Sequence, residues 1–300
     1  MNLRFTPVVH ELLQGACDIH IHSAPDLYPR IQNDVELARC AQEAGMRAIL
    51  IKNHFTETAA RAQVASQVTG FQVFGGIVLN HSVGGINPHA VEPALKMGAK
   101  VVWMPTLHAR EFLTKKSHVK SLAGEIGADL EGVYLLQENG RLIDEVQAVL
   151  DLIIAHDSCL ATGHISKPEA RALVAEAARR GVKKIVVTHP MASFVNYNID
   201  EMKELLDLGA TWLEHVFNDT TRQVGHPITR EALFTGIKAV GAERCIMSTD
   251  SGQWLNPIPA QQMGIYITDA LDFGLSPAEV KKMVQDNPAA MLGLEQEHTS

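Results

Sequence analysis

The stretch CDIHIHSAPD, at residues 17–26, places two histidines one residue apart. In a β-strand, residues i and i+2 project from the same face, so His20 and His22 would present their imidazoles together. Imidazoles bind zinc and similar divalent metals, and a carboxylate commonly completes such a site. The stretch therefore predicts part of a metal site, to which other elements must bring the remaining ligands.

Three further candidates follow apolar runs elsewhere in the chain. His164 comes after SCLATG, His189 ends KIVVTH, and Asp250 comes directly after RCIMST. A single histidine at the end of a strand usually belongs to the core or its rim. Here a histidine pair, two more histidines and an aspartate all lie at the ends of such runs. Packing explains this whole set much less well than it explains a single histidine. The set predicts a metal site.

Short runs rich in apolar and β-branched residues alternate with longer amphipathic segments, which predicts an α/β fold of parallel strands and helices. The sequence contains eight such runs, at residues 16–22, 47–53, 72–79, 100–105, 158–163, 184–189, 211–216 and 244–249. Eight strand–helix units indicate a (β/α)8 TIM barrel that forms a single domain over residues 1–300. A doubly wound open sheet is the alternative. In a barrel, the carboxyl ends of all the strands would gather the candidate ligands at one face.

The spacing of the units breaks once, after the fourth run. Residues 106–141 exceed the usual length of a connection between a strand and its helix. Within them, GVYLLQENGRLI predicts a small hairpin that turns at residues 138–140. The polar, basic segment HAREFLTKKSHVKSLAGEIG before it predicts a lid over the barrel. A surface insertion without a catalytic role is the alternative.

The composition argues against several classes of partner. The net charge of −8 is spread along the chain without a long basic run, which disfavours nucleic acid. No apolar run approaches the roughly 20 residues that a membrane helix needs. The first residues lack the pattern of a signal peptide, so a cytoplasmic location is expected. We expect a small-molecule substrate, while a homo-oligomer is only a weak expectation.

In their order along the chain, DIHIH, TGH, VTHP and STD resemble the amidohydrolase superfamily of metal-dependent hydrolases. The segment NHSVGGINPHAVEPALKMGAKVVWMPT also resembles an uncharacterised single-barrel family of amidohydrolase-like proteins. The resemblance implies that His20, His22 and Asp250 bind one metal ion. It implies that His164 and His189 bind a second ion, or that one of them joins the first site. Asp250 would also take a proton from the metal-bound water.

The sequence departs from this superfamily at the fourth strand. Two-metal members commonly bridge their ions there with a carboxylated lysine or a glutamate, whereas this chain has Met104, Pro105 and Thr106. Three explanations remain open: Lys52 reaches into the site, as the free amine or carboxylated; His108 supplies a nitrogen; or the site holds one metal. Lys52 is also interpreted as a cation that grips an anionic substrate, which we favour, or as a rim residue that extends to solvent.

Other candidates lie in the segments that follow the strands. Asp26 and Arg30, in SAPDLYPR, are predicted to face substrate, with Arg30 as an anion-binding group. The alternative for Asp26 is a hydrogen-bond partner of a ligand histidine. His54 and His81 are further candidates for substrate contact. Of the neighbours Glu214 and His215, only one can face the barrel centre. We expect His215, because it lies nearer to the end of its strand.

The leading hypothesis is a hydrolase that uses a metal-activated water on a cyclic amide, lactone, amide or ester. Asp250 would manage the proton, while Lys52, His54 and Arg30 orient the substrate. Zinc is the first choice of metal, although Mn, Fe, Co and Ni suit the same ligands. One alternative is a decarboxylase or C–C lyase on the same barrel. Another is a metal-binding or ligand-binding protein without catalysis.

Overall fold

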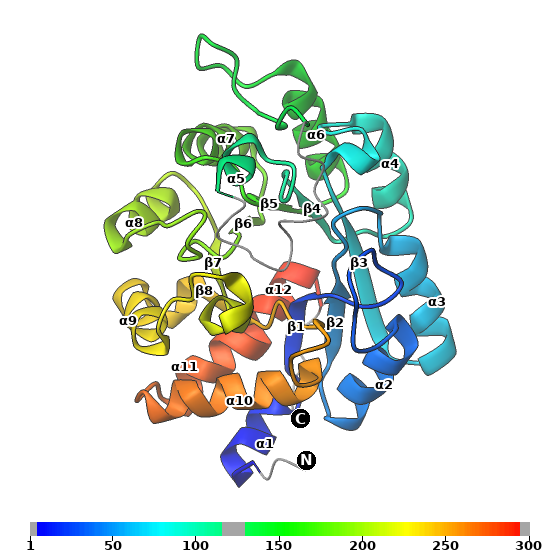
Figure 1. The fold of residues 1–300 in the computed structure, drawn as a ribbon, viewed down its shortest axis with the longest axis vertical. Helices are drawn as coiled ribbons and strands as arrows, with labels where there is room; N and C mark the ends of the chain where they lie inside the picture. Colours follow the sequence, from blue (N-terminus) through cyan, green and yellow to red (C-terminus); the bar gives the residue numbers. More distant parts are fainter. Residues whose placement is uncertain (1–4, 116–129, 295–300) are drawn as a thin grey trace.

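The computed structural model describes residues 5–115 and 130–294. Its eight strands pair in parallel, in chain order from the first to the eighth, as Figure 1 shows. The strands are β1 (Cys17–Ile21), β2 (Ala48–Ile51), β3 (Gln72–Val78), β4 (Val101–Trp103), β5 (Cys159–Ala161), β6 (Ile185–Val187), β7 (Trp212–Val216) and β8 (Cys245–Ser248). Each strand lies inside the run that the sequence predicts. The observed strands are shorter because several end residues leave the sheet and enter the loops.

The first and last strands meet and close the sheet. The backbone N–H of Asp250 donates to the carbonyl of His20 over 2.8 Å, and the N–H of His22 donates to the carbonyl of Ser251 over 2.7 Å. Ile21 and Ser251 also form a parallel bridge. This seam confirms the predicted (β/α)8 barrel. The alternative of a doubly wound open sheet is wrong, because such a sheet keeps two free edges.

Helices surround the strands in the order expected for strand–helix units (Figure 1). They are α1 (Pro7–Leu13), α2 (Asp34–Glu43), α3 (Ala59–Thr69), α4 (Pro88–Lys96), α5 (Arg110–Thr114), α6 (Asp144–Ala155), α7 (Lys167–Arg180), α8 (Ile199–Asp207), α9 (Arg230–Val240), α10 (Pro259–Asp272), α11 (Pro277–Lys281) and α12 (Asn287–Leu292). Capping boxes begin α2, α7, α8 and α11, each with an Asn or Ser at the N-cap and a Glu three residues later. These local signals fix where the helices start.

Apolar side chains fill the barrel below the candidate site. Residues of the strands, among them Ile19, Leu50 and Trp103, pack with Met291 and Leu292 of α12 in one buried cluster. A Cβ at Gly76, on β3, would lie 2.5 Å from the Trp103 ring, so only glycine leaves room for this indole. The interior is therefore a packed core with Trp103 in its upper layer, and chemistry is confined to the carboxyl ends of the strands.

The long connection after β4 is described only in part. Helix α5 lies in it, and a parallel bridge joins Ala109 to Val133. Leu136 and Leu142 form an antiparallel bridge around a turn in which Gly140 has φ +78°. This single bridge lies where the hairpin is predicted. Much of the predicted lid falls on residues 116–129, which lie outside the described residues, so the lid remains a prediction.

Within residues 5–115 and 130–294, no helix combines the length and the apolar character needed to cross a membrane. The four cysteines are free thiols, of which Cys17, Cys159 and Cys245 are buried. Burial raises the pKa of the Cys17 and Cys245 thiols to about 12, which keeps them protonated and unreactive. They therefore contribute to packing.

The seam between β1 and β8 leaves no room for a side chain at Gly252. This residue has φ +122°, and an added Cβ would lie 1.8 Å from the carbonyl oxygen of His22. Gly181 also has a positive φ, of +92°, but nothing lies within 4 Å of its Cβ position. We expect Gly252→Ala to lower the free energy of unfolding in urea by more than about 3 kcal/mol, against about 1 kcal/mol for Gly181→Ala. Equal losses would contradict this account of the seam.

Candidate metal centre

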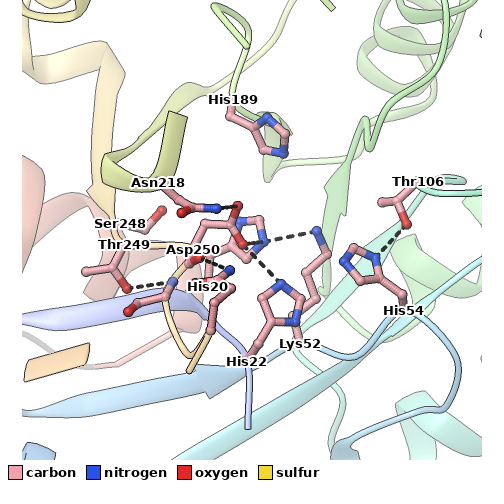
Figure 2. Close-up of polar contacts among 12 residues, drawn as sticks. His20, His22, Lys52, His54, Thr106, His189, Asn218, Ser248, Thr249 and Asp250 are labelled. Carbon is pink, nitrogen blue, oxygen red and sulfur yellow. Dashed lines mark hydrogen bonds and ion pairs between the residues drawn. The ribbon is translucent and has the colours of Figure 1, made fainter. Parts of the chain in front are cut away.

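Three predicted ligands meet at the carboxyl ends of β1 and β8. The Nε2 atoms of His20 and His22 lie 3.2 Å and 3.0 Å from the same oxygen, Oδ1 of Asp250. All three side chains offer ligand atoms within 4.8 Å of one another. Figure 2 shows the two imidazoles beside Asp250, with His189 facing them from the other side. The three ligands predicted for the first metal ion therefore form one compact cluster.

The backbone that carries these ligands is irregular. The pairing of β1 with β2 shifts register between Asp18 and Ile21, at the position of His20. Asp250 and His189 adopt positive φ values of +50° and +21°, although neither is glycine. Non-glycine residues hold such conformations only where the surrounding structure enforces them, and these residues cluster at functional sites.

Glu214 on β7 orients His20 from behind. Its Oε1 lies 3.0 Å from Nδ1 of His20 and accepts a hydrogen bond of 2.7 Å from the Ser248 hydroxyl. With Nδ1–H donating to this carboxylate, the Nε2 lone pair of His20 is directed at the cluster. Carboxylates commonly orient metal-binding histidines in this way.

The expectation that His215 faces the barrel centre is wrong, because Glu214 occupies that direction. His215 lies on the same side of β7 as Leu213, which packs with Met202 and Leu205 of α8 in the core. His215 is buried, and it does not line the cavity above the cluster. Its place nearer to the end of the strand did not decide its direction, which the alternation of side chains sets.

The other two predicted ligands form a second pair. His164 and His189 lie with their Nε2 atoms 3.2 Å apart, and both side chains are buried. Among the described residues, neither Nδ1 atom has a hydrogen-bond partner. The nearest carboxylate is that of Asp219, whose Oδ2 is 3.8 Å from Nδ1 of His189. The rings pack beside Phe194, which holds them at the cavity wall.

The electrostatics of the cluster suit a metal cation. Burial holds the pKa of His22 and His164 well below its usual range and lowers that of His189 to about 3, so these imidazoles are neutral, as metal ligands must be. Burial and Lys52 lower the pKa of His20, but the carboxylates of Asp250 and Glu214 outweigh them and raise it overall. A positive charge between these carboxylates is therefore favoured, and the donor set fits a divalent ion.

Lys52 reaches the cluster from β2. Its side chain is 1% exposed, and Nζ lies 3.0 Å from Nε2 of His20 and 5.4 Å from the Trp103 ring centroid. Burial lowers its pKa to about 8. The interpretation of Lys52 as a rim residue that extends to solvent is therefore wrong. An ion bound to Nε2 of His20 would displace this amine toward the cavity.

His108 does not join the cluster. Its Nδ1 accepts a hydrogen bond of 3.3 Å from the backbone N–H of His81, and it does not line the cavity. The end of β4 supplies no other ligand, since the Thr106 hydroxyl bonds to Nδ1 of His54 and to the Asn80 amide. Among the alternatives for the missing bridge, this leaves Lys52 or a single metal.

A cavity of about 480 Å³ opens above the cluster. It is lined by His22, Tyr28, Pro29, Arg30, Lys52, His54, Leu107, Phe112, His164, His189, Phe194, Asn218, Asp219, Arg222, Gln223, Val224, Asp250, Gln253, Trp254 and Leu255. A volume of this size suits a small-molecule ligand.

The remaining sequence candidates divide into two groups. Arg30 and His54 line the cavity, and their contact with substrate stays a prediction. Asp26 and His81 do not line it, so the expectation that they contact substrate is not supported for either. Asp26 instead bonds to Nε of Arg30 over 2.7 Å, whereas Nε2 of His81 lies 2.7 Å from the carbonyl of Glu131, away from the metal cluster.

Sequence reasoning missed the segment that follows β7. Asn218, Asp219 and Arg222 all line the cavity, and Asn218 Nδ2 lies 3.4 Å from Oδ2 of Asp250. Burial and the carboxylates of Asp250 and Glu214 raise the pKa of Asp219 well above its usual range. The available signal was the polar run NDTTRQ, which begins two residues after the end of a predicted strand. It contains no histidine, so it carries no pattern typical of a metal site.

Comparison with known protein families assigns the chain. A model described as "Family of unknown function (DUF6282)" matches residues 15–213. The chain belongs to this family. The matched part of this DUF6282 chain includes both histidine pairs and Lys52, and it ends before Glu214 and Asp250. No curated protein matches the DUF6282 chain.

Solved structures share the fold. An amidohydrolase from Pseudomonas aeruginosa has a TM-score of 0.62 at 11% identity, over 95% of this chain and 98% of that one. An organophosphorus hydrolase from Deinococcus radiodurans has a TM-score of 0.60 at 15% identity, over 94% of both chains. A dihydroorotase has a TM-score of 0.56 at 13% identity, over 95% of this chain and 70% of that one. The DUF6282 chain therefore has the barrel that the resemblance to amidohydrolases implied.

Metal loading tests the cluster directly. We expect protein purified without added metal, or soaked in Zn²⁺ or Mn²⁺, to contain at least about one equivalent of metal by elemental analysis. His20→Ala combined with His22→Ala should lose it, because two of three converging ligands are gone. The control, His81→Ala, should keep the metal because its side chain lies outside the cavity. Metal-free wild-type protein after soaking would overturn the assignment.

Glu214→Gln tests the orientation of His20. The amide keeps the shape of the side chain but loses the charge that holds Nδ1–H. We expect the metal affinity to fall about 10- to 100-fold, as measured by competition with a chromogenic chelator. His215→Gln, on the opposite face of the same strand, should leave the affinity within about twofold of wild type. Equal effects of the two variants would contradict this assignment.

Proposed function

We propose that this protein is a metal-dependent hydrolase that acts on a small molecule. The observation that carries the proposal is the convergence of His20, His22 and Asp250 at the mouth of the barrel, beneath a cavity of about 480 Å³. The pair of His164 and His189 supplies ligands for a second ion or a further ligand for the first. Substrates of the proposed class are cyclic amides, lactones, amides and esters, and Zn²⁺ is the foremost candidate for the ion.

A divalent ion at this cluster would lower the pKa of water and polarise the electrophilic bond of the substrate. The chain's own contribution centres on Asp250. Its Oδ1 faces His20 and His22, while the one side-chain hydrogen bond to Oδ2 among the described residues comes from the Asn218 amide, 3.4 Å away. Oδ2 is therefore placed to accept the proton of the attacking water and to return it to the leaving group.

Two residues beside the cluster, His54 and Lys52, have nitrogen atoms that could bind a substrate. Nδ1 of His54 is held by the Thr106 hydroxyl at 2.9 Å, and its ring stacks on His22 with centroids 4.9 Å apart. Its Nε2 is then left to meet a ligand in the cavity. Lys52, once displaced from His20 by an ion, would present its amine to an oxygen of the substrate. We assign both residues to the orientation of substrate and the stabilisation of developing negative charge.

One observation favours a second candidate reaction. The end of β4 carries Met104, Pro105 and Thr106, of which none bridges two ions in the way that a glutamate or carboxylated lysine does. A mononuclear site suits decarboxylation or C–C cleavage, in which the ion acts as a Lewis acid on a bound carbonyl. The two reactions share the metal cluster and differ in whether water enters the product.

Asp250→Asn tests the proposed chemistry. We expect wild-type, metal-loaded protein to turn over at least one member of a panel of lactones, cyclic amides and aryl esters, with oxygen from isotopically labelled water in the product. Asp250→Asn should reduce kcat at least about 100-fold, because the amide cannot accept the proton. Asp272→Asn, an exposed position at the end of α10, serves as the control and should retain full activity.

The product distinguishes the candidates. Release of CO₂ or cleavage of a C–C bond without solvent oxygen would replace the hydrolase with the second reaction. If Asp250→Asn kept the wild-type rate while it lost its metal, the activity would not belong to this cluster. A metal-loaded protein that turns over no member of the panel and shows neither of these other reactions would support a binding protein instead.

A further inference from the structure

Arg30 stands at the cavity with a fixed orientation. Its side chain is only 4% exposed, and the buried carboxylate of Asp26 accepts a hydrogen bond of 2.7 Å from its Nε. The backbone around it is also held, since Arg30 forms an antiparallel bridge with Gln253, and the N–H of Ile31 donates to Gly252 over 3.0 Å. These contacts join the Arg30 loop to the loop that carries Asp250.

The Asp26 contact uses only one nitrogen of the guanidinium. Among the described residues, no hydrogen bond to either terminal nitrogen, Nη1 or Nη2, is found. These two nitrogens form the edge of the guanidinium that matches the two oxygens of a carboxylate. The positive charge of Arg30 is one of the contributions that lower the pKa of His22 and His54, so its field reaches the metal cluster.

Two other cationic side chains line the cavity, but neither is both buried and free to bind a carboxylate with two nitrogens. Lys52 has its amine 3.0 Å from Nε2 of His20, inside the metal cluster. Arg222 is exposed to solvent, where an ion pair contributes little. Arg30 alone of these three combines burial, a carboxylate that holds it and an uncommitted two-nitrogen edge.

One part of the cavity wall is apolar. Tyr28, Phe112, Phe194, Trp254 and Leu255 line it, and Trp254 and Leu255 remain 61% and 65% exposed at its mouth. Large apolar side chains left open to water beside a cavity are typical of a surface that a ligand covers. An occupant would gain most by placing a hydrocarbon or aromatic body against these residues.

We propose that the substrate of this site carries a carboxylate attached to an apolar group about the size of an aromatic ring. The free edge of Arg30 binds the carboxylate, and the reacting bond lies at the metal cluster. That this ligand is the substrate rests on the proposed function. The binding mode itself does not depend on turnover. Arg30 would act as the specificity-determining residue, and Asp26 would hold it in place.

The test compares two probes that differ only in charge. Phenylacetate and phenylacetamide have nearly the same shape, and their binding is measured by titration calorimetry on metal-loaded and on chelator-treated protein. We expect both forms of the wild type to prefer phenylacetate by at least about tenfold. Arg30→Met should abolish this preference, and Arg30→Lys should restore only part of it because ammonium lacks the two-nitrogen edge.

The control is Arg179→Met, which removes an exposed arginine that pairs with Glu176 on α7 and should change nothing. Thermal unfolding of each variant shows whether it is folded. Should Arg30→Met fail to fold, Arg30→Lys and the wild-type preference still decide the matter. Lack of a preference in the wild type overturns the inference. So does a preference that Arg30→Met retains and metal removal abolishes, because the ion would then be the anchor.

A preference that depends on Arg30 in a protein without detectable turnover has a different meaning. It would uphold the carboxylate site and contradict the proposed hydrolase. Turnover by a wild type that shows no preference for phenylacetate would uphold the hydrolase and contradict the carboxylate site. The two proposals therefore fail separately.

Discussion

The seam where β8 returns to β1 is the constraint on which the site depends. The hydrogen bond from the Asp250 N–H to the His20 carbonyl both closes the barrel and sets the distance between the two ligands. Just below it, the Asp18 carboxylate accepts hydrogen bonds from the backbone N–H and the hydroxyl of Thr249. A change that opened this seam would therefore separate the candidate metal ligands as well as weaken the fold.

Buried polar and charged side chains, whose burial is unfavourable for folding, gather at the carboxyl ends of the strands. Glu214 and Lys52 are about 1% exposed, and burial of a charge is unfavourable unless partners offset it. Below them, Trp103 and the residues of α12 make the interior apolar and dense. The Nδ1 atoms of His164 and His189 lack partners among the described residues. Buried polar groups without hydrogen-bond partners contribute little to the stability of the fold. A bound cation is therefore the simplest physical reason for their arrangement.

The site is divided between two kinds of scaffold. Strand ends supply the candidate metal ligands, whose directions follow from the alternation of side chains and the parallel order of the sheet. Loops supply the cavity walls, including Arg30 and Trp254. Loops change more readily than strands without loss of the fold, so one barrel can serve different substrates. This division agrees with the wide separation in sequence between this chain and the solved structures that share its fold.

The sequence by itself predicted the eight strands and the residues of the candidate metal cluster, because periodicity and strand ends are local and the two histidines of DIHIH share a face. It favoured the barrel but left the open sheet as an alternative, which the contact between β1 and the residues after β8 decided. It did not determine which of Glu214 and His215 points inward, nor that Asp26 holds Arg30 instead of touching the cavity. It also passed over Asp219, which carries no metal-ligand motif. These outcomes depend on the tertiary structure, since strand phase and loop conformation are decided by contacts between residues far apart in the chain.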